Sequence, residues 1–188
     1  MQRLLRSFCA LPVLALASLF AVPAHAERVN ATGASQATVV APLSLIKIRD
    51  LKFGRIAART VAGTVTVNPN TGACTVTGPI LSVGGCGFSE FAGMGTRRMN
   101  VRIQIPTTVT LTGPGGATML ADTFTLATSP DLSYIGGNGN GIGNGNRRYS
   151  INSNTGIFTF RIGGRLNVRA NQAPGVYNGT FSVTVVYQ

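Results

Sequence analysis

Four residues of this chain could carry thiol, metal or proton-transfer chemistry, namely Cys9, Cys74, Cys86 and His25. Cys9 and His25 fall in an N-terminal segment with the build of an export signal, so Cys74 and Cys86 remain in the exported chain. Two cysteines without a histidine make a poor zinc site, because structural zinc is usually held by four such ligands. In an oxidising compartment we expect a disulfide between Cys74 and Cys86, with two free buried thiols as the alternative.

Acid–base catalysis has few candidate groups in this sequence. Without His25, no side chain has an ordinary pKa near neutrality. The five carboxylates are Glu27, Asp50, Glu90, Asp122 and Asp131. They are spread along the chain, and none stands in a motif with a nucleophile or with a second carboxylate. Serine and threonine without a neighbouring base are weak nucleophiles. We therefore expect no enzyme, no cofactor and no bound metal.

The charge of the chain is strongly positive, with a formal net charge of +11. The export signal contains Arg3 and Arg6, so residues 27–188 carry +9 (11 − 2). The basic residues are scattered, and only the doublets Arg97-Arg98 and Arg147-Arg148 stand together. A nucleic-acid site would need basic residues clustered in a stripe or patch, so no nucleic acid is expected, whereas an anionic surface is a plausible ligand.

The first residues predict export from the cytoplasm. Arg3 and Arg6 form a positive region, residues 11–22 an apolar core, and Ala24-His25-Ala26 a cleavage site. A membrane-spanning helix needs roughly 20 apolar residues, which this run does not reach. We expect a signal peptide at residues 1–26, an N-terminal extension at 27–36 and one domain at 37–188.

The remaining chain predicts β-structure throughout. Stretches rich in Val, Ile, Thr and Phe alternate with period two and are broken by turn residues at short intervals, which is typical of a sandwich. The expected strands are residues 38–48, 64–67, 74–77, 79–83, 99–105, 108–112, 123–127, 149–151, 157–160, 161–168 and 177–187. NPNTG at 68–72 and NSNTG at 152–156 each predict a hairpin turn, closed by a glycine that accepts a positive φ.

Two interruptions modify this pattern. Pro42 lies in the first expected strand and cannot donate to a ladder, and the apolar positions change phase after it, from Leu43 and Leu45 to Ile46 and Ile48. The strand is therefore expected at a sheet edge or at a bend between sheets. The glycine and asparagine tract at 136–146 lacks the lysine of a phosphate loop and the aspartate of a calcium repeat, so an exposed loop is expected.

The last run, QAPGVYNGTFSVTVVYQ, is the most regular strand pattern in the chain. One face carries apolar residues, namely Tyr177, Phe181, Val183, Val185 and Tyr187, with Gly179 between them, and the other carries Asn and hydroxyl residues. Tyr187 is the penultimate residue and Gly175 is the fourteenth from the end. This ending resembles the carboxyl-terminal motif of chaperone-usher pilin subunits, in which these two positions bracket the strand that a periplasmic chaperone grips.

A broader similarity covers ATVVAPLSLIKIRDLKFG, GTVTVNPNTG and GGRLNVRANQAPGVYNGTFSVTVVYQ. These stretches resemble a bacterial family of secreted β-domains of unknown function, whose ending is similar to spore-coat-U-type and related pilus subunits. The resemblance implies an immunoglobulin-like β-sandwich at a Gram-negative surface. Pilin sandwiches lack their last strand, so it also implies a sandwich that a donor strand from another chain completes.

The N-terminal extension offers a donor for such an exchange. Val29, Ala31 and Gly33 alternate with polar or small residues, and pilin donor strands typically contain a glycine, which Gly33 would match. These side chains are small, and bulky aliphatic residues are scarce before Val39. A frayed N-terminus is the alternative for this segment.

We therefore expect a structural subunit of a cell-surface fimbria that is assembled by donor-strand exchange. The resemblance implies itself or related subunits as partners, together with a periplasmic chaperone and an outer-membrane usher. The assembly residues would be Gly175 at the start of the strand and Tyr177, Phe181, Val183, Val185 and Tyr187 along it. The alternative is a monomeric secreted sandwich that binds polysaccharide or another anionic surface. A small outer-membrane barrel is a third reading, disfavoured by the absence of tryptophan and the few tyrosines for interfacial girdles.

Overall fold

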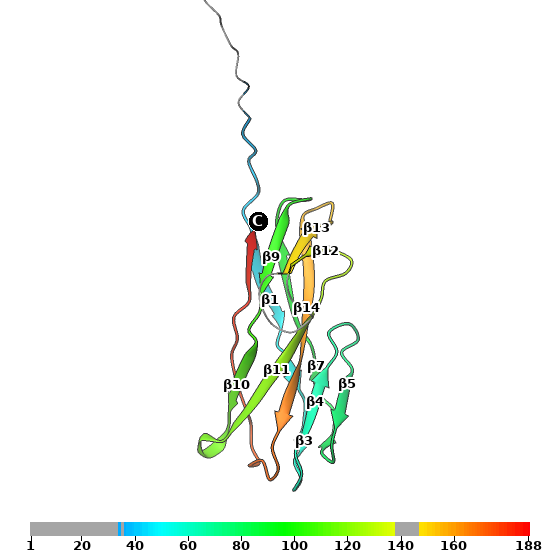
Figure 1. The fold of residues 1–188 in the computed structure, drawn as a ribbon, viewed down its shortest axis with the longest axis vertical. Coiled ribbons are helices and arrows are strands. Elements are labelled where there is room, and N and C mark those ends of the chain that lie inside the picture. Colours follow the sequence, from blue (N-terminus) through cyan, green and yellow to red (C-terminus); the bar gives the residue numbers. More distant parts are fainter. Residues whose placement is uncertain (1–33, 35, 138–146) are drawn as a thin grey trace, which may run out of the picture. The chain divides into compact units, whose positions relative to one another are not determined.

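The computed structural model describes residues 34, 36–137 and 147–188. The β-strands all belong to the compact unit Thr38–Gln188 (Figure 1). The expected signal peptide, the expected donor residues Val29, Ala31 and Gly33, and residues 138–146 of the glycine and asparagine tract lie outside the described residues. Within the described part, no helix has the length and apolar character to cross a membrane.

The larger sheet is seven-stranded and antiparallel, with the order β1-β8-β14-β11-β10, and β4 pairs with both β14 and β5. Its strands are β1 (Ser44–Arg49), β4 (Gly63–Val67), β5 (Cys74–Thr77), β8 (Ser89–Met94), β10 (Thr108–Thr112), β11 (Thr118–Ala127) and β14 (Ile157–Val168). The 3₁₀ turn η1 (Pro114–Gly116) joins β10 to β11.

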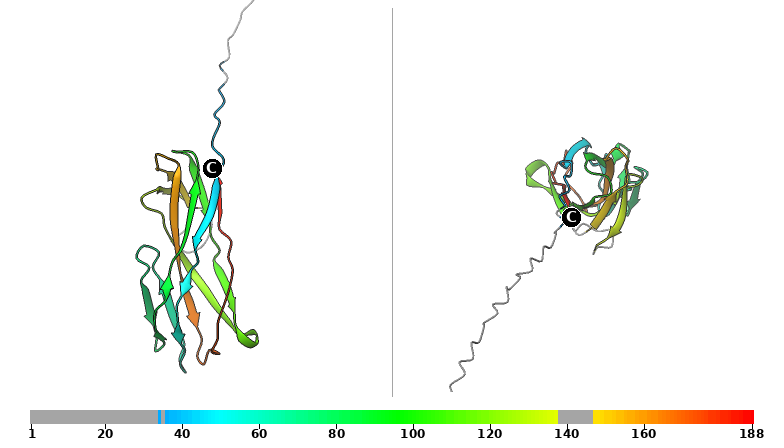
Figure 2. Two further views of the ribbon diagram at one scale, coloured as in Figure 1. Left: turned by 180° about the vertical axis from the view of Figure 1, so that it is seen from behind. Right: turned by 90° about the horizontal axis from the view of Figure 1, so that it is seen from above.

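The smaller sheet is four-stranded, with the order β12-β13-β9-β15. Its strands are β9 (Asn100–Gln104), β12 (Leu132–Gly136), β13 (Arg147–Ile151) and β15 (Thr184–Tyr187). Two short pairs complete the unit, β2 (Lys52–Phe53) with β7 (Cys86–Gly87) and β3 (Ile56–Ala57) with β6 (Leu81–Ser82). Seen from above, the strands curl around one interior (Figure 2). The expected all-β, sandwich-like fold is confirmed.

One apolar core fills the space between the sheets. Along β14, Phe158, Phe160, Ile162, Leu166 and Val168 are buried, while Thr159, Arg161, Arg165 and Asn167 between them are only partly buried. Phe160 stacks on Phe91 of β8, with ring centroids 5.4 Å apart. The smaller sheet contributes alternate residues as well, among them Val101 and Ile103 from β9. This period-two burial is what a strand with one core face requires.

The predicted disulfide is confirmed, since Cys74 at the start of β5 is bonded to Cys86 at the start of β7. The preceding NPNTG stretch forms the predicted hairpin between β4 and β5. Asn68 organises this turn, because its side-chain oxygen accepts a hydrogen bond from the Asn70 backbone N–H at 2.8 Å. The disulfide thus connects the hairpin to the short β2–β7 pair and stabilises the fold by about 2–4 kcal/mol, as expected for a covalent loop of this length.

The second predicted hairpin is wrong. The NSNTG stretch joins β13 to β14, and these strands belong to different sheets. The glycine that closes the turn does have a positive φ, of 76° at Gly156. The turn itself was therefore predicted correctly. Local turn chemistry does not determine whether the two flanking strands pair with each other or belong to different sheets.

The C-terminal segment runs beside strands of both sheets. β10 of the larger sheet and β9 of the smaller one are separated by only three residues, 105–107. The C-terminal segment 177–187 runs antiparallel to both, with a bridge between Asn178 and Thr112 and the β15–β9 pairing further on. The expected continuous strand at 177–187 is therefore shorter, since only Thr184–Tyr187 forms a ladder.

Candidate functional site

The first and the last strand of the unit are both edge strands. β1 pairs only with β8, and β15 pairs only with β9. The two strands lie on the same flank of the unit in Figure 1, where β1 is cyan and β15 is red, and Figure 2 shows them in different layers. No hydrogen-bonded pairing joins them among the residues described. We refer to β1 with its flanking residues 41–43, and to segment 177–187, as the two open edges.

The C-terminal open edge presents a row of apolar side chains toward the core. Phe181, Val183, Val185 and Tyr187 pack against the core cluster but are only partly buried. Phe181 contacts Phe124, with ring centroids 5.8 Å apart. The alternation predicted for this run is therefore present in the burial of its side chains, including in the part that forms no ladder.

Tyr187 connects the two open edges at one end. Its hydroxyl donates a hydrogen bond to the backbone oxygen of Ala41 at 2.9 Å and accepts one from the backbone N–H of Thr96 at 2.8 Å. Because Ala41 lies just before β1, the penultimate tyrosine fixes the distance between the first strand and the last one. Sequence reasoning assigned Tyr187 to this edge without indicating that its hydroxyl would bind the opposite one.

The β1 open edge carries a lysine where a core residue would stand in a closed sandwich. Leu43 and Leu45 are partly buried against the core. The next inward position is Lys47, which lies directly opposite the buried Phe91. Directly opposite residues of an antiparallel pair share one face of the sheet. The Lys47 side chain is nevertheless 58% exposed, with its Nζ 2.6 Å from Asp50, so water reaches the inner face at this edge.

The sequence predicted an edge position for this strand but did not assign the strand to the assembly site. The strand keeps one phase, with Leu43, Leu45 and Lys47 at inward positions, so Ile46 and Ile48 are exposed on its outer face. The edge position of the strand, expected from Pro42, is also observed, although Pro42 itself precedes the ladder. The sequence pattern that could have predicted an open inner face is a lysine that follows two leucines at alternate positions.

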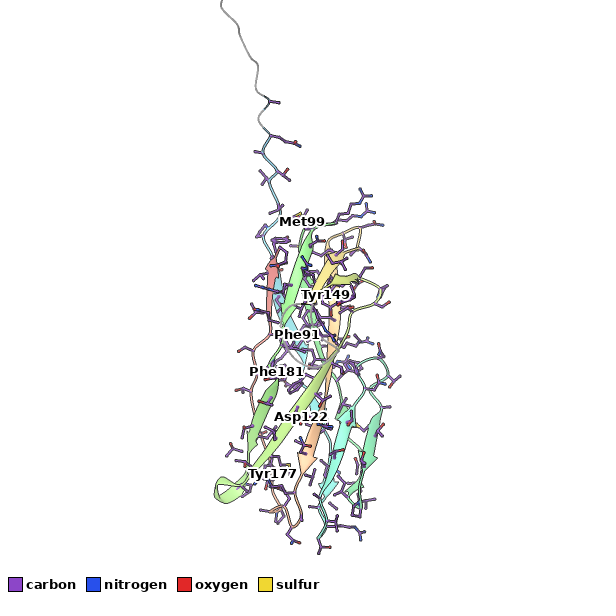
Figure 3. The ribbon with its side chains drawn as sticks, in the orientation of Figure 1. Phe91, Met99, Asp122, Tyr149, Tyr177 and Phe181 are labelled. Atoms are coloured by element: carbon purple, nitrogen blue, oxygen red, sulfur yellow. A yellow bond between two sulfur atoms is a disulfide. The ribbon has the colours of Figure 1, made fainter. Side chains whose placement is uncertain are left out.

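Gly175 and Tyr177 lie away from the other predicted assembly residues. Tyr177 is at the opposite end of the sandwich from Met99, near the turn between β10 and β11 (Figure 3). Its ring lies against Gly113, and its hydroxyl accepts a hydrogen bond from the Gln172 side chain at 2.8 Å. A Cβ at Gly175 would lie 2.2 Å from Pro114 Cγ. These two residues hold the C-terminal segment against the β10–β11 turn.

One carboxylate on the outer face of the larger sheet, that of Asp122, has a structural role. Asp122 Oδ1 and Oδ2 accept hydrogen bonds from Arg165 Nε and Nη2, at 2.8 and 3.1 Å, and Oδ2 also accepts one from Asn167. The adjacent Thr123 has a φ of 50° and marks a β-bulge in the β11–β14 pairing. These hydrogen bonds, of which the Arg165 bond has the largest effect, hold the pKa of Asp122 below its ordinary value of 3.8.

We expect Asp122→Asn to lower stability at neutral pH by about 1 kcal/mol, because the bidentate pair with Arg165 is partly shielded from water. A carboxylate with a lowered folded-state pKa contributes its stability above the unfolded value of 3.8 and loses it as pH falls through the folded-state pKa. The difference between variant and wild type in urea unfolding should therefore disappear at pH values well below 3.8. Asp50→Asn, in an exposed pair, is the control, and a pH-independent effect at Asp122 would contradict the assignment.

The described residues offer little else as a chemical site. No group of three or more His, Cys, Asp and Glu among them is placed to hold a metal ion. Glu90, although largely buried, is bound by Arg49 at 3.0 Å and Arg161 at 2.9 Å, so its charge is compensated. What the open edges can do is bind an extended backbone segment, because an unpaired strand edge presents free N–H and C=O groups.

Comparison with known proteins gives one match. A family model described as a domain of unknown function, DUF4402, matches residues 43–187, which includes both open edges except residues 41 and 42. No curated protein and no solved structure matches the chain.

Proposed function

The chain belongs to the DUF4402 family, a domain family of unknown function, and we propose that it is a structural subunit of a cell-surface fimbria, assembled when a strand from a neighbouring subunit binds between its two open edges. The observation that carries this proposal is that β1 and β15 are both edge strands whose inward side chains remain partly exposed. Lys47, which faces inward and is 58% exposed, supports it independently.

An inserted strand would satisfy both edges at once. It would pair with the free backbone groups of β1 and of segment 177–187, and its alternate side chains would cover Val183 and Val185. Covering apolar surface stabilises by about 25 cal/mol per Å² removed from water, so the completed sandwich is more stable than the open one. The same argument makes the open form prone to association through its edges.

The donor we propose is residues 27–36 of the next subunit. Val29, Ala31 and Gly33 supply alternate small side chains, which suit a site already occupied in part by Phe181 and Tyr187. The partners would be copies of this chain or related subunits in the fibre. The resemblance of the ending to that of chaperone-usher pilins adds a periplasmic chaperone, which would cover the same edges before assembly, and an outer-membrane usher.

The test is electrophoresis of material sheared from cells that produce the full-length protein, with boiled and unboiled samples compared. We expect a ladder of subunit multiples that collapses to one band only on boiling, because strand exchange is non-covalent but slow to reverse. Deleting residues 27–36 should remove the ladder while leaving a folded monomer that a chaperone can bind.

Matched substitutions test the acceptor half of the proposal. Val183→Asn with Val185→Asn places amides on the inward face, whereas Ser182→Asn with Thr184→Asn places them on the exposed face of the same segment. The first pair should abolish the ladder and the second should leave it intact. A well-folded wild-type monomer that gives a single band with and without boiling would overturn the proposal.

A further inference from the structure

A pair of arginines lies side by side on the solvent face of the smaller sheet. Arg148 of β13 is directly opposite Arg102 of β9. Their sequence neighbours Val101, Ile103 and Tyr149 are buried in the core, so both arginines face outward. Directly opposite residues have Cβ atoms about 4.5–5.5 Å apart, and like charges in such a pair are destabilising. The register thus places two positively charged residues on neighbouring strands of the solvent face.

No carboxylate side chain offsets this charge within the described part of the chain. The four carboxylate side chains there are all bound elsewhere, Asp50 by Lys47, Glu90 by Arg49 and Arg161, Asp122 by Arg165, and Asp131 by Thr159. The Nε of Arg102 is covered and has no hydrogen-bond partner. The neighbouring Arg147 is not included in the pair, because it interacts with the Tyr149 side chain.

Val186 of β15 lies directly opposite Arg102 and Gly136 of β12 directly opposite Arg148, and neutral hydrogen-bonding groups lie before and after the pair along the strands. Asn100 and Gln104 flank Arg102 on the same face of β9, and Ser150 follows Arg148 on β13. Thr184 of β15 lies opposite Gln104. A planar guanidinium binds the oxygens of a carboxylate, sulfate or phosphate through two parallel hydrogen bonds. Amides and hydroxyls on either side can bind sugar hydroxyl groups.

We propose that Arg102 and Arg148 form a binding site for an acidic polysaccharide, with the two guanidinium groups on one sulfate or carboxylate and the flanking amides on adjacent sugar hydroxyls. The site lies on the outer face of the smaller sheet and leaves the inward faces of both open edges free. It does not rest on the proposed filament, because a monomer and an assembled subunit present the same pair.

A nucleic acid is the less suitable ligand for this face. Base recognition by single-stranded binding proteins depends on aromatic side chains on which bases stack. The outward positions of β9 and β13 hold Asn100, Arg102, Gln104, Arg148 and Ser150, and none of these is aromatic. A membrane surface would require an apolar face, which these residues do not provide.

The test measures binding of the exported full-length protein to dextran sulfate and to polygalacturonate, with neutral dextran as the uncharged reference. Arg102→Gln with Arg148→Gln should weaken binding of the preferred polymer about tenfold or more, since charge-assisted hydrogen bonds are lost from both guanidinium groups. The control is Arg59→Gln with Arg169→Gln, which removes the same charge from two exposed arginines elsewhere. The control should weaken binding by less than about twofold.

The variant at the site should also melt at a temperature no lower than that of the wild type, because a like-charge pair has been removed. Preference for one acidic polymer identifies the anion as sulfate or carboxylate. An equal loss in the site and control variants would mean attraction by net charge alone and would overturn the proposal. Failure of both acidic polymers to bind, equal binding of neutral dextran, or tighter binding of single-stranded DNA would overturn it as well.

Discussion

Phe160→Ala is expected to remove about 3–5 kcal/mol from the free energy of unfolding, the range for truncating a fully buried phenylalanine. Phe160 is 1% exposed and lies at the middle of the core, with its ring stacked on Phe91 and 6.5 Å from that of Phe158. Its alanine variant would leave a cavity that neighbouring strands cannot close, because β14 is held by ladders on both sides. A domain with typical stability of about 5–15 kcal/mol would lose much of it.

Phe88 provides the matched control for this prediction. It is only partly buried, and the guanidinium groups of Arg161 and Arg49 lie 4.6 and 5.1 Å from its ring centroid. Phe88→Ala should therefore lower stability by only about 1–2 kcal/mol, from lost cation–π contacts and partial exposure. Urea unfolding followed by circular dichroism measures both variants, and similar losses at the two positions would contradict the assigned core.

Gly156→Ala is the second substitution expected to have a large effect, at about 3 kcal/mol or more. Gly156 has a φ of 76°, and an added Cβ would lie 2.0 Å from the backbone oxygen of Gly95. The backbones are already joined, since the Gly95 N–H donates a hydrogen bond to the Gly156 oxygen at 2.9 Å. The collision therefore involves backbone on both sides and cannot be relieved by rotating a side chain.

Gly72→Ala is the control that distinguishes the two causes of this loss, the positive φ and the contact of the added Cβ with backbone. It closes the equivalent turn with a φ of 75°, but its Cβ would meet only the Phe88 ring at 3.4 Å, an ordinary contact. Gly72→Ala should thus lose only the penalty of a left-handed backbone, about 1–2 kcal/mol. Thermal unfolding of the two variants gives the difference, and equal losses would show that the contact with Gly95 has no effect.

The sequence allowed prediction of the features that depend on neighbouring residues. The β4–β5 hairpin followed from the NPNTG turn, and β10 was predicted at its observed bounds, Thr108–Thr112. The inward face of segment 177–187 followed from its alternation, and the disulfide from the two cysteines that lie outside the expected signal peptide. Each of these signals lies within about a dozen residues, a distance over which pattern and turn chemistry are informative.

The features that were not predicted depend on pairing between distant residues. Ser89–Met94 was not predicted as a strand, because five of its six residues are partly or fully shielded by neighbours on both faces and it shows no alternation. Ile157–Val168 was divided into two expected strands but is one strand. β1 and segment 177–187 come from the two ends of the domain. No local sequence pattern therefore predicts that these two edges lie on the same flank.

The position of β14 determines when the larger sheet can fold. It pairs with β4, β8 and β11, which all precede it, and the farthest of these, β4, begins at Gly63 while β14 ends at Val168. In the export that we propose, the N-terminus crosses the membrane first, so these three strands would emerge before their shared central neighbour. Long-range pairing of this kind folds slowly and leaves strand edges unpaired in the meantime. In that proposed export, we expect the interval between the emergence of β4 and that of β14 to be when a chaperone would be most useful.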